Sequence, residues 1–475
     1  MRFARDPGLR GCAAALVLAL ACPAGAAAGS LADALVAAYR NSPELAAARA
    51  DVKILSERAV QARAQGRLRV EGNLSNEISL FERSRGSSAV AGGDRFDFAF
   101  PSSVSLGFTQ PLYTGGQVEN ATEAAETRIS AQEAALVATE QVLLLDAVTA
   151  FMNVRRDAEL VDVARNNVGV LSQQLRAASE RFEVGEITRT DVEQARARFA
   201  AAQSRLAAQT GALEVSRQVY LQVVGEPAGE LVPPPPLPDL PGALDVAVAI
   251  ALRGDPRIIA ARLEREASGS DVRSAMGALL PQVSLQGALG STDSDITDGS
   301  IRRLESVAVG LFVTIPIWSG GANYARVREA QAFAERASAD ITARMRAAAQ
   351  RVGVAWANLE VARASIEAGE LEVRAAELAF EGVNEEAKVG ARTTIDVLDA
   401  EQEVLNARAG LVEARHDEYV AAYALLEAIG KLTVAHLGLD LDETPSVASY
   451  YETVRDRNFG YDKTDDTVWR FTLRP

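Results

Sequence analysis

The sequence predicts an α+β membrane protein in which long coiling helices continue a β-barrel that several copies of the chain build together. Three observations lead to this class. The chain repeats itself, each half holds alternating apolar segments as long as bilayer-crossing strands, and each half then carries apolar heptads over about 70 residues. The predicted unit is therefore a strand hairpin followed by a long helical hairpin, present twice.

The composition fits long helices. The chain has 475 residues and is 48% hydrophobic, which is enough for a sizeable core, but aromatic residues make up only 5%. Stretches rich in Ala, Glu, Arg and Leu favour extended helices over compact α/β domains. The net charge of −15 argues against a nucleic-acid partner, because phosphates require an excess of Lys and Arg.

Residues 1–28 are predicted to be a secretory signal peptide. They combine early arginines, an apolar run and a stretch of small residues: Arg2, Arg5, Arg10, 13–21 and 24–28. Both cysteines, Cys12 and Cys22, lie inside this segment, so we expect no disulfide in the mature chain. The alternative is a lipid anchor on Cys22, although Ala19 sits where such signals usually carry a larger aliphatic residue. No later run of 18 or more uninterrupted apolar residues exists, so we expect no membrane-spanning helix.

The two halves align with two constant offsets. Leu31 to Arg49 matches Leu244 to Arg262 at an offset of 213, and an offset of 205 holds without a gap from Val104 until Gly225 meets Gly430. The offset changes between the two strands of each hairpin. We divide the chain into a first repeat at 29–225, a linker at 226–242, a second repeat at 243–437 and a tail at 438–475. The linker contains four consecutive prolines and should be extended, and we expect the tail to pack at the equatorial waist of the helices.

Four strands are predicted from period-two alternation. The apolar positions in the first half are Leu68, Val70, Gly72, Leu74, Ile78 and Leu80, then Phe96, Phe98, Phe100, Val104, Leu106, Phe108 and Leu112. Those in the second half are Val283, Leu285, Gly287 and Leu289, then Val307, Val309, Leu311, Val313, Ile315 and Ile317. Each second strand ends in a strand-to-helix corner marked by Pro111, Gly115 and Gly116 or by Pro316, Gly320 and Gly321.

After each corner the apolar period becomes seven. Val154, Val161, Val168, Leu175 and Phe182 follow it in the first half, and Leu359, Ile366, Val373, Phe380 and Ala387 hold the equivalent positions. Sustained heptads indicate helices that coil around neighbours. At about 1.5 Å per residue, the outgoing helix should be on the order of 100 Å long.

The strands argue for a membrane and for an oligomer. In hydrocarbon every backbone polar group must be paired, so strands there form closed barrels. Four strands are too few to close one, so copies must pool their strands, giving eight from a dimer or twelve from a trimer. The strand count cannot choose between these two. A water-soluble β-sandwich capping a coiled coil is the alternative, but two hairpins make too little sheet to bury such an apolar face.

Several motifs resemble one family. They are the segments at 41–43 (NSP), 110–116 (QPLYTGG), 389–400 (VGARTTIDVLDA) and 425–430 (LLEAIG), in this order over nearly the whole mature length. The chain resembles the TolC-like outer-membrane efflux and secretion channels, and its first turn, 181–192, resembles the type I secretion branch. The resemblance implies a homotrimer with a twelve-stranded barrel in outer-membrane lipid and a twelve-helix tunnel in the periplasm. It implies a passive exit duct for secreted protein or small toxic compounds, with neither enzymatic activity nor cofactor.

The resemblance also implies partners and site residues. A periplasmic adaptor and an inner-membrane transporter, of the ABC or RND type, would dock at the tip turns, Val184, Gly185, Val389 and Gly390. Asp396 and Asp399 would form acidic rings that narrow the tunnel. The alternative for Asp396 is that it is a helix N-cap. Asp191, Thr190 and Arg392 occupy positions that tie the hairpins together in the family.

Two other classes of function fit the sequence less well. A periplasmic adaptor also uses long helical hairpins, but it usually carries one hairpin and soluble β domains. An enzyme is disfavoured, because no Ser/His/Asp set, phosphate loop or nucleotide fingerprint is present. The only histidines, His416 and His436, stand twenty residues apart without cysteines nearby, so a metal site is not expected.

Overall fold

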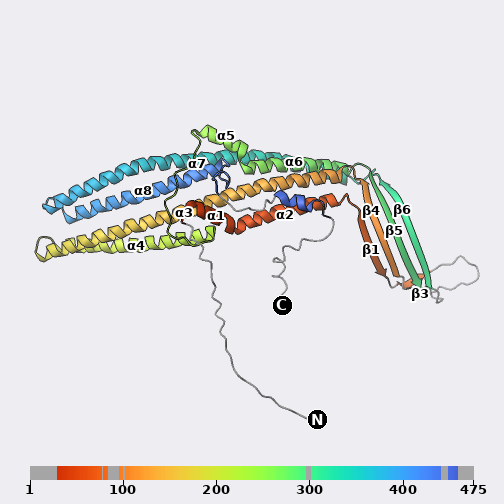
Figure 1. Cartoon of the computed structure of the whole chain (residues 1–475), viewed down its shortest axis with the longest axis horizontal. Coiled ribbons are helices and arrows are strands. Elements are labelled where there is room, and N and C mark those ends of the chain that lie inside the picture. The colour runs from red at the N-terminus through yellow and green to blue at the C-terminus, as the bar shows by residue number, and fades with distance from the viewer. Residues whose placement is uncertain are drawn as a thin grey trace, which may run out of the picture.

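The computed structural model describes residues 29–77, 79–83, 96–99, 102–295, 301–439 and 448–457. The predicted signal peptide and most of the predicted tail lie outside the described residues. The molecule is long, with a sheet at one end and two helical hairpins reaching the other (Figure 1).

The elements follow the same order in both repeats. The first repeat contains α1 (Leu31–Asn41), α2 (Pro43–Ala64), β1 (Arg69–Asn76), β2 (Ser79–Arg83), β3 (Phe96–Ala99), β4 (Ser102–Tyr113), α3 (Gln117–Glu183) and α4 (Arg189–Val224). The second contains α5 (Leu244–Gly254), α6 (Pro256–Gly277), β5 (Gln282–Asp295), β6 (Ile301–Thr314), α7 (Ala322–Lys388) and α8 (Thr394–Ala428), and α9 (Ala448–Val454) follows. Helices α3 and α7 each have 67 residues.

The main sheet is antiparallel, with the strand order β1-β4-β5-β6, and β2 and β3 extend the first hairpin as a separate pair. Arg69 pairs with Thr109 in the first hairpin, and Gln282 pairs with Thr314 in the second. Gln282 is the equivalent of Arg69 at the offset of 213, and Thr314 is the equivalent of Thr109 at the offset of 205. The strand register therefore agrees with the two sequence offsets. Strands β1 and β6 are the two edges of this sheet.

One face of the sheet is apolar and uncovered in the single chain. Its exposed side chains on β6 are Val307, Val309, Leu311 and Val313, with Val307 83% exposed. Ile315 and Ile317, which the alternation assigned to the same strand, are also exposed but follow the end of β6 at Thr314, so the predicted strand was too long. Leu74, Val104 and Leu106 are exposed in the first hairpin. Residues Ile78 and Phe100 and the side chains of Leu80, Phe96 and Phe98 lie outside what the structure describes.

Local sequence explains where the shorter helices begin. The Ser30 hydroxyl accepts a hydrogen bond from the Asp33 amide, and the Asp33 carboxylate accepts one from the Ser30 amide, which is a capping box. Helices α2 and α6 each begin with a proline after a capping Ser42 or Asp255. The motif at 41–43 is thus a helix stop followed at once by a helix start.

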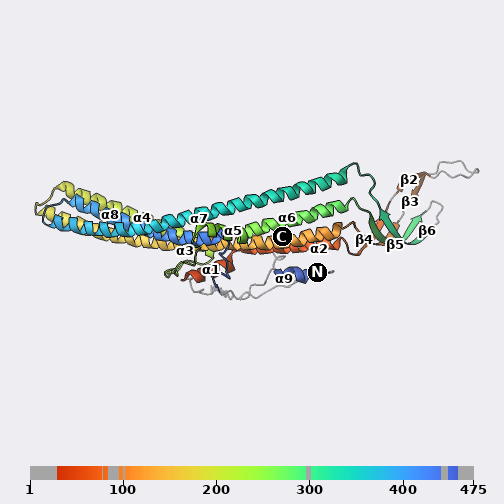
Figure 2. The ribbon, with the colours of Figure 1, turned by 90° about the horizontal axis from the view of Figure 1, so that it is seen from above.

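The main core lies at the waist, where α1 and α5 pack against the long helices (Figure 2). Its largest fully buried side chains include Phe151, Tyr220, Leu359, Leu425 and Leu426. This core explains why one stretch of α3 is long and apolar enough to span a membrane by composition alone: half of that stretch is buried inside the protein. We interpret it as a core segment, as the sequence predicts.

The linker and the described part of the tail are docked on the helices. Leu231, Leu237 and Leu240 pack against the waist core, and the Tyr419 hydroxyl donates to the Pro235 carbonyl at 3.1 Å. Helix α9 lies beside α2 (Figure 2). Tyr451 donates from α9 to Glu126 of α3 at 2.6 Å, which places α9 between the waist and the sheet.

Candidate functional site

The two helical tips end in identical turns. Gly185 and Gly390 both have φ of +79°, a conformation that glycine adopts without strain. The Glu186 amide donates to the Arg181 carbonyl, and the Ala391 amide to the Glu386 carbonyl, each at 2.9 Å. These bonds are those of a Schellman motif, which ends a helix at a glycine. Both turns are in view at the end opposite the sheet in Figure 1, and they present exposed valines, Val184 and Val389.

The return helices begin with capping boxes. The Thr393 amide donates to the Asp396 carboxylate at 2.9 Å, and the Asp396 amide donates to the Thr393 hydroxyl at 3.4 Å. Thr393 is therefore the N-cap, and the alternative that Asp396 is the N-cap is wrong. A threonine hydroxyl reaches the amide three residues on, which places the acid at the third helical position. The hydrogen bonds from Thr393 lower the pKa of Asp396. Asp191 pairs with Thr188 in the same way.

Two residues that the resemblance places at the tie between hairpins, Arg392 and Asp191, form hydrogen bonds within their own turns. Arg392 donates to Glu386 at 2.8 Å, and this bond raises the pKa of the guanidinium. Thr190 is exposed on the first turn of α4. Among the described residues, Arg198 on α4 forms an ion pair with Asp399 on α8 at 2.7 Å, which joins the two hairpins. Sequence reasoning missed Arg198, because it lies outside every motif; its opposite charge to Asp399 was the only signal.

Next to Asp399 in the sequence, α8 packs an apolar side chain against the first hairpin. Leu398, only 3% exposed, packs in a cluster with α3 and α4 residues Leu171, Ala178, Val192, Ala195 and Ala202. One turn further, Glu401 is 7% exposed, and its Oε2 has no hydrogen-bond partner among the residues that the structure describes. Burial raises the pKa of Glu401 to about 7.

The strand-to-helix corners depend on paired glycines. Gly115 and Gly116 have φ of +67° and +79°, and Gly320 and Gly321 have φ of +59° and +84°. At the first corner the backbone of Gly115 lies against the backbone of Gly277 at the end of α6. Pro111 lies beside a register irregularity between β4 and β5, and Pro316 follows the end of β6.

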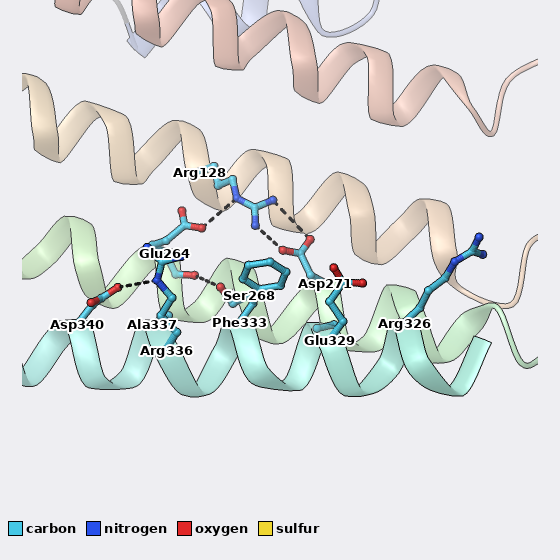
Figure 3. Close-up of a pocket in the computed structure, with 11 residues that line it drawn as sticks. Arg128, Glu264, Ser268, Asp271, Arg326, Glu329, Phe333, Arg336, Ala337 and Asp340 are labelled. Atoms are coloured by element: carbon cyan, nitrogen blue, oxygen red, sulfur yellow. Dashed lines mark hydrogen bonds and ion pairs between the residues drawn. The ribbon is translucent and has the colours of Figure 1, made fainter. Parts of the chain in front are cut away.

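A groove of about 580 Å³ lies between α3, α6 and α7, on the sheet side of the waist (Figure 3). Arg128 of α3 points across it to α6, donating to Glu264 at 3.2 Å and pairing with Asp271 (Figure 3). The Arg128 guanidinium thus lies between two carboxylates of α6, and these ion pairs join the two repeats. Within the described ranges, no three His, Cys, Asp or Glu residues gather in a way that could hold a metal ion.

The family profile for outer membrane efflux proteins matches residues 34–225 and 247–431. The chain is 35% identical over 435 residues to the outer membrane efflux protein BepC of Brucella suis, covering 91% of both chains. It is 24% identical over 343 residues to the outer membrane protein TolC of Escherichia coli K12, covering 70% of this chain and 69% of TolC. The solved structure of CusC superposes with a TM-score of 0.73 at 19% identity, covering 84% of this chain and 92% of that one.

Proposed function

The chain belongs to the outer membrane efflux protein family and is an outer-membrane exit duct of a tripartite export system, and we propose that three copies form its channel. The strand end lies in the outer membrane, and the helical part lies in the periplasm. In the proposed channel, an inner-membrane pump, of the ABC or RND type, loads cargo through a periplasmic adaptor. Transport is then passive, and no catalytic residue is required of this chain.

The observation that carries the proposal is the open sheet. Four strands expose an apolar face, and within the residues that the structure describes, the two edge strands, β1 and β6, have no further partner strand. Phe108 of β4 pairs with Gly287 of β5 where the two repeats meet. In the repeat, Val313 is the equivalent of Phe108 (offset 205), and Leu74 is the equivalent of Gly287 (offset 213). The equivalent pair would therefore join Val313 of one copy to Leu74 of the next. A ring of copies would thus satisfy both edges with a register already present in the chain.

The helices support the same ring. Helix α3 packs extensively against α6, which belongs to the other repeat. The equivalent contact would be made by α7 with α2 of the next copy. The sheet-side half of α7 exposes Tyr324 and Phe333, as expected for a surface that another copy covers. Three copies, which the family resemblance implies, give twelve strands and a closed wall of helices.

The tip is the proposed constriction and docking region. Asp399 and Asp396 would come close to their copies around the threefold axis, so their carboxylates would favour cations. Asp396 also stabilises the start of α8 through its capping box with Thr393. The charge of Asp399 is partly neutralised by Arg198. The exposed turns with Val184 and Val389 are the surface that we assign to the adaptor.

A direct test is the conductance of the purified protein in planar bilayers. We expect trimer-sized particles from the outer-membrane fraction that resist a carbonate wash and form discrete channels. Release by carbonate, without channels, would instead favour the alternative of a periplasmic adaptor.

A further inference from the structure

We propose that an anionic phospholipid of the periplasm-facing leaflet binds at each boundary between neighbouring copies, where the strands meet the helices. This inference rests on the proposed ring of copies and goes beyond it, because it assigns a ligand to the boundary. We call the contact of Gly115 with Gly277 the intra-chain corner. The equivalent contact, of Gly320 with the end of α2 in the next copy, is the inter-chain corner.

The inter-chain corner has more room than the intra-chain corner. At the intra-chain corner, a Cβ on Gly277 would overlap the carbonyl oxygen of Gly115, so this close contact requires glycine. Helices α2 and α6 both have 22 residues, and Ala64 ends α2 where Gly277 ends α6. The methyl group of Ala64 therefore keeps Gly320 of the neighbouring copy at a greater distance. A gap is left between two copies that is not present between the two repeats of one chain.

The α7 side of this gap carries an unbalanced positive charge. At the intra-chain corner, Glu123 of α3 pairs with Arg273 of α6 at 2.7 Å. The repeat offsets place Arg328 at the position of Glu123, and Val60 of the next copy at the position of Arg273. Arg328 is exposed, and it takes part in none of the ion pairs within the described part of the chain. The next copy, which presents Val60 there, supplies no acid at this position.

The α2 side of the gap brings a second cation. Arg67, just after α2, holds the position that Leu280 holds after α6. The side chain of Leu280 lies against Gly115 at the intra-chain corner, so Arg67 should lie beside Gly320 at the inter-chain corner. An apolar contact within the chain is thus replaced by a guanidinium group between chains.

The acids of α9 do not offset these cations. The ion pairs described there join two acids to three arginines: Asp456 and Glu452 with Arg63, Arg67 and Arg455. Arg328 of the neighbouring copy would add a further arginine, so the cluster keeps an excess of positive charge. A phosphate group suits such a cluster, because a planar guanidinium group can donate two parallel hydrogen bonds to its oxygens.

The corner lies at the depth of the lipid headgroups, because strands in the outer membrane end there and periplasmic helices begin. Ile317 and Trp318, in the second corner, are 91% and 87% exposed. Their equivalents, Leu112 and Tyr113, remain 57% and 48% exposed although β5 and α6 are in place beside them. A neighbouring copy should therefore leave Ile317 and Trp318 partly open to acyl chains, at the level that tryptophan favours. A phosphate that carries acyl chains fits the charge, the depth and the apolar surface together.

Native mass spectrometry of the detergent-solubilised trimer tests the site. We expect one molecule of phosphatidylglycerol to bind at each boundary, about tenfold more tightly than phosphatidylcholine. The variant Arg67→Leu/Arg328→Glu, which installs the residues of the intra-chain corner, should remove this preference. Arg328→Lys should retain most of it, and Arg273→Ala, at the intra-chain corner, should leave it unchanged.

The outcomes separate this inference from the function on which it rests. Equal affinity for the two lipids, or an unchanged preference in the double variant, overturns it. Competition by inorganic phosphate also overturns it, because a site for the bare anion does not need acyl chains. Loss of the preference in Arg273→Ala would place the lipid at the wrong corner and overturn it as well. A wild-type protein that forms no trimer and no channel would instead refute the proposed function.

A second measurement leaves the arginines in place and so does not depend on how their variants fold. Phospholipids brominated on their acyl chains quench nearby tryptophans, and comparison of wild type with Trp318→Phe isolates the fluorescence of Trp318. In phosphatidylcholine vesicles, we expect a small fraction of brominated phosphatidylglycerol to quench Trp318 more strongly than the same fraction of brominated phosphatidylcholine. Equal quenching by the two brominated lipids would overturn the inference.

Discussion

Gly115 and Gly277 close the first strand-to-helix corner backbone against backbone: a Cβ on Gly115 would overlap the carbonyl oxygen of Gly277. We predict that Gly115→Ala destabilises the protein by about 2 kcal/mol or more, because it adds this clash to the strain of a positive φ. The measurement is the thermal unfolding midpoint of the detergent-solubilised trimer.

Gly116 provides the matched control. Its φ is also positive, but a Cβ there would meet only the amide nitrogen of Asn120, a side chain that can move. Gly116→Ala should therefore lower the midpoint by less than Gly115→Ala does. Equal effects would show that φ alone matters and that contact with α6 does not.

The strand register across the subunit boundary is a second prediction. The repeat offsets pair Val313 of β6 with Leu74 of β1 in the next copy. Val313→Cys combined with Leu74→Cys should give dimers and trimers that resist detergent under oxidising conditions and disappear on reduction. The two side chains are exposed in the chain, so neither substitution empties a core.

The control for this crosslink is a shift of one residue. Ser75 lies next to Leu74 on β1, and successive side chains of a strand point to opposite faces. Val313→Cys with Ser75→Cys should therefore give little crosslink. A stronger crosslink from the shifted pair would mean a different register or a different neighbour.

Phe333 yields a third prediction about the same boundary. It occupies the position of Arg128 in the repeat, and Arg128 joins α3 to α6. We expect Phe333 to be covered by α2 of the next copy, so Phe333→Glu should reduce the fraction of trimer in outer-membrane extracts. Phe333→Leu should preserve it. An intact trimer in the glutamate variant would place Phe333 outside the boundary.

Glu401 yields a prediction about pH. Burial raises its pKa from the ordinary 4.5 to about 7, so the folded state holds a proton that the unfolded chain has released. The contribution of this carboxyl to stability should therefore be fully present below about pH 4.5, be lost as the pH rises to about 7, by about 3 kcal/mol, and then level off.

The matched variant is Glu401→Gln, which is neutral at every pH. The difference in unfolding midpoint between wild type and variant, measured from pH 5 to pH 8, isolates this carboxyl from all other groups. We expect the variant to be the more stable protein at pH 8. A difference that does not change with pH would mean that Glu401 is hydrated in the assembled tip.

The sequence predicted the elements well, because the signals were local and appeared twice. Alternation, heptads and the glycine corners each depend on residues that are close in the sequence. Because each pattern occurs in both repeats, a chance match in one repeat could be recognised by its absence from the other. The pairing of Arg198 with Asp399 could not be predicted, because it depends on how two hairpins lie side by side. The sequence correctly placed Asp396 at the start of a helix, but it did not identify Thr393 as the N-cap. The choice between the two residues depends on the backbone angles φ and ψ, which the sequence pattern does not specify.

The docked linker has a consequence for proteolysis. Leu231, Leu237 and Leu240 hold the segment on the waist core, and Tyr419 holds Pro235, so the connection between the repeats is fastened along its length. A protease that cut it once would leave both new ends attached, and the halves would still be joined by Leu398, by Arg198 and by the pairing of β4 with β5. Nicked chains should migrate as two fragments after denaturation and yet purify as one channel.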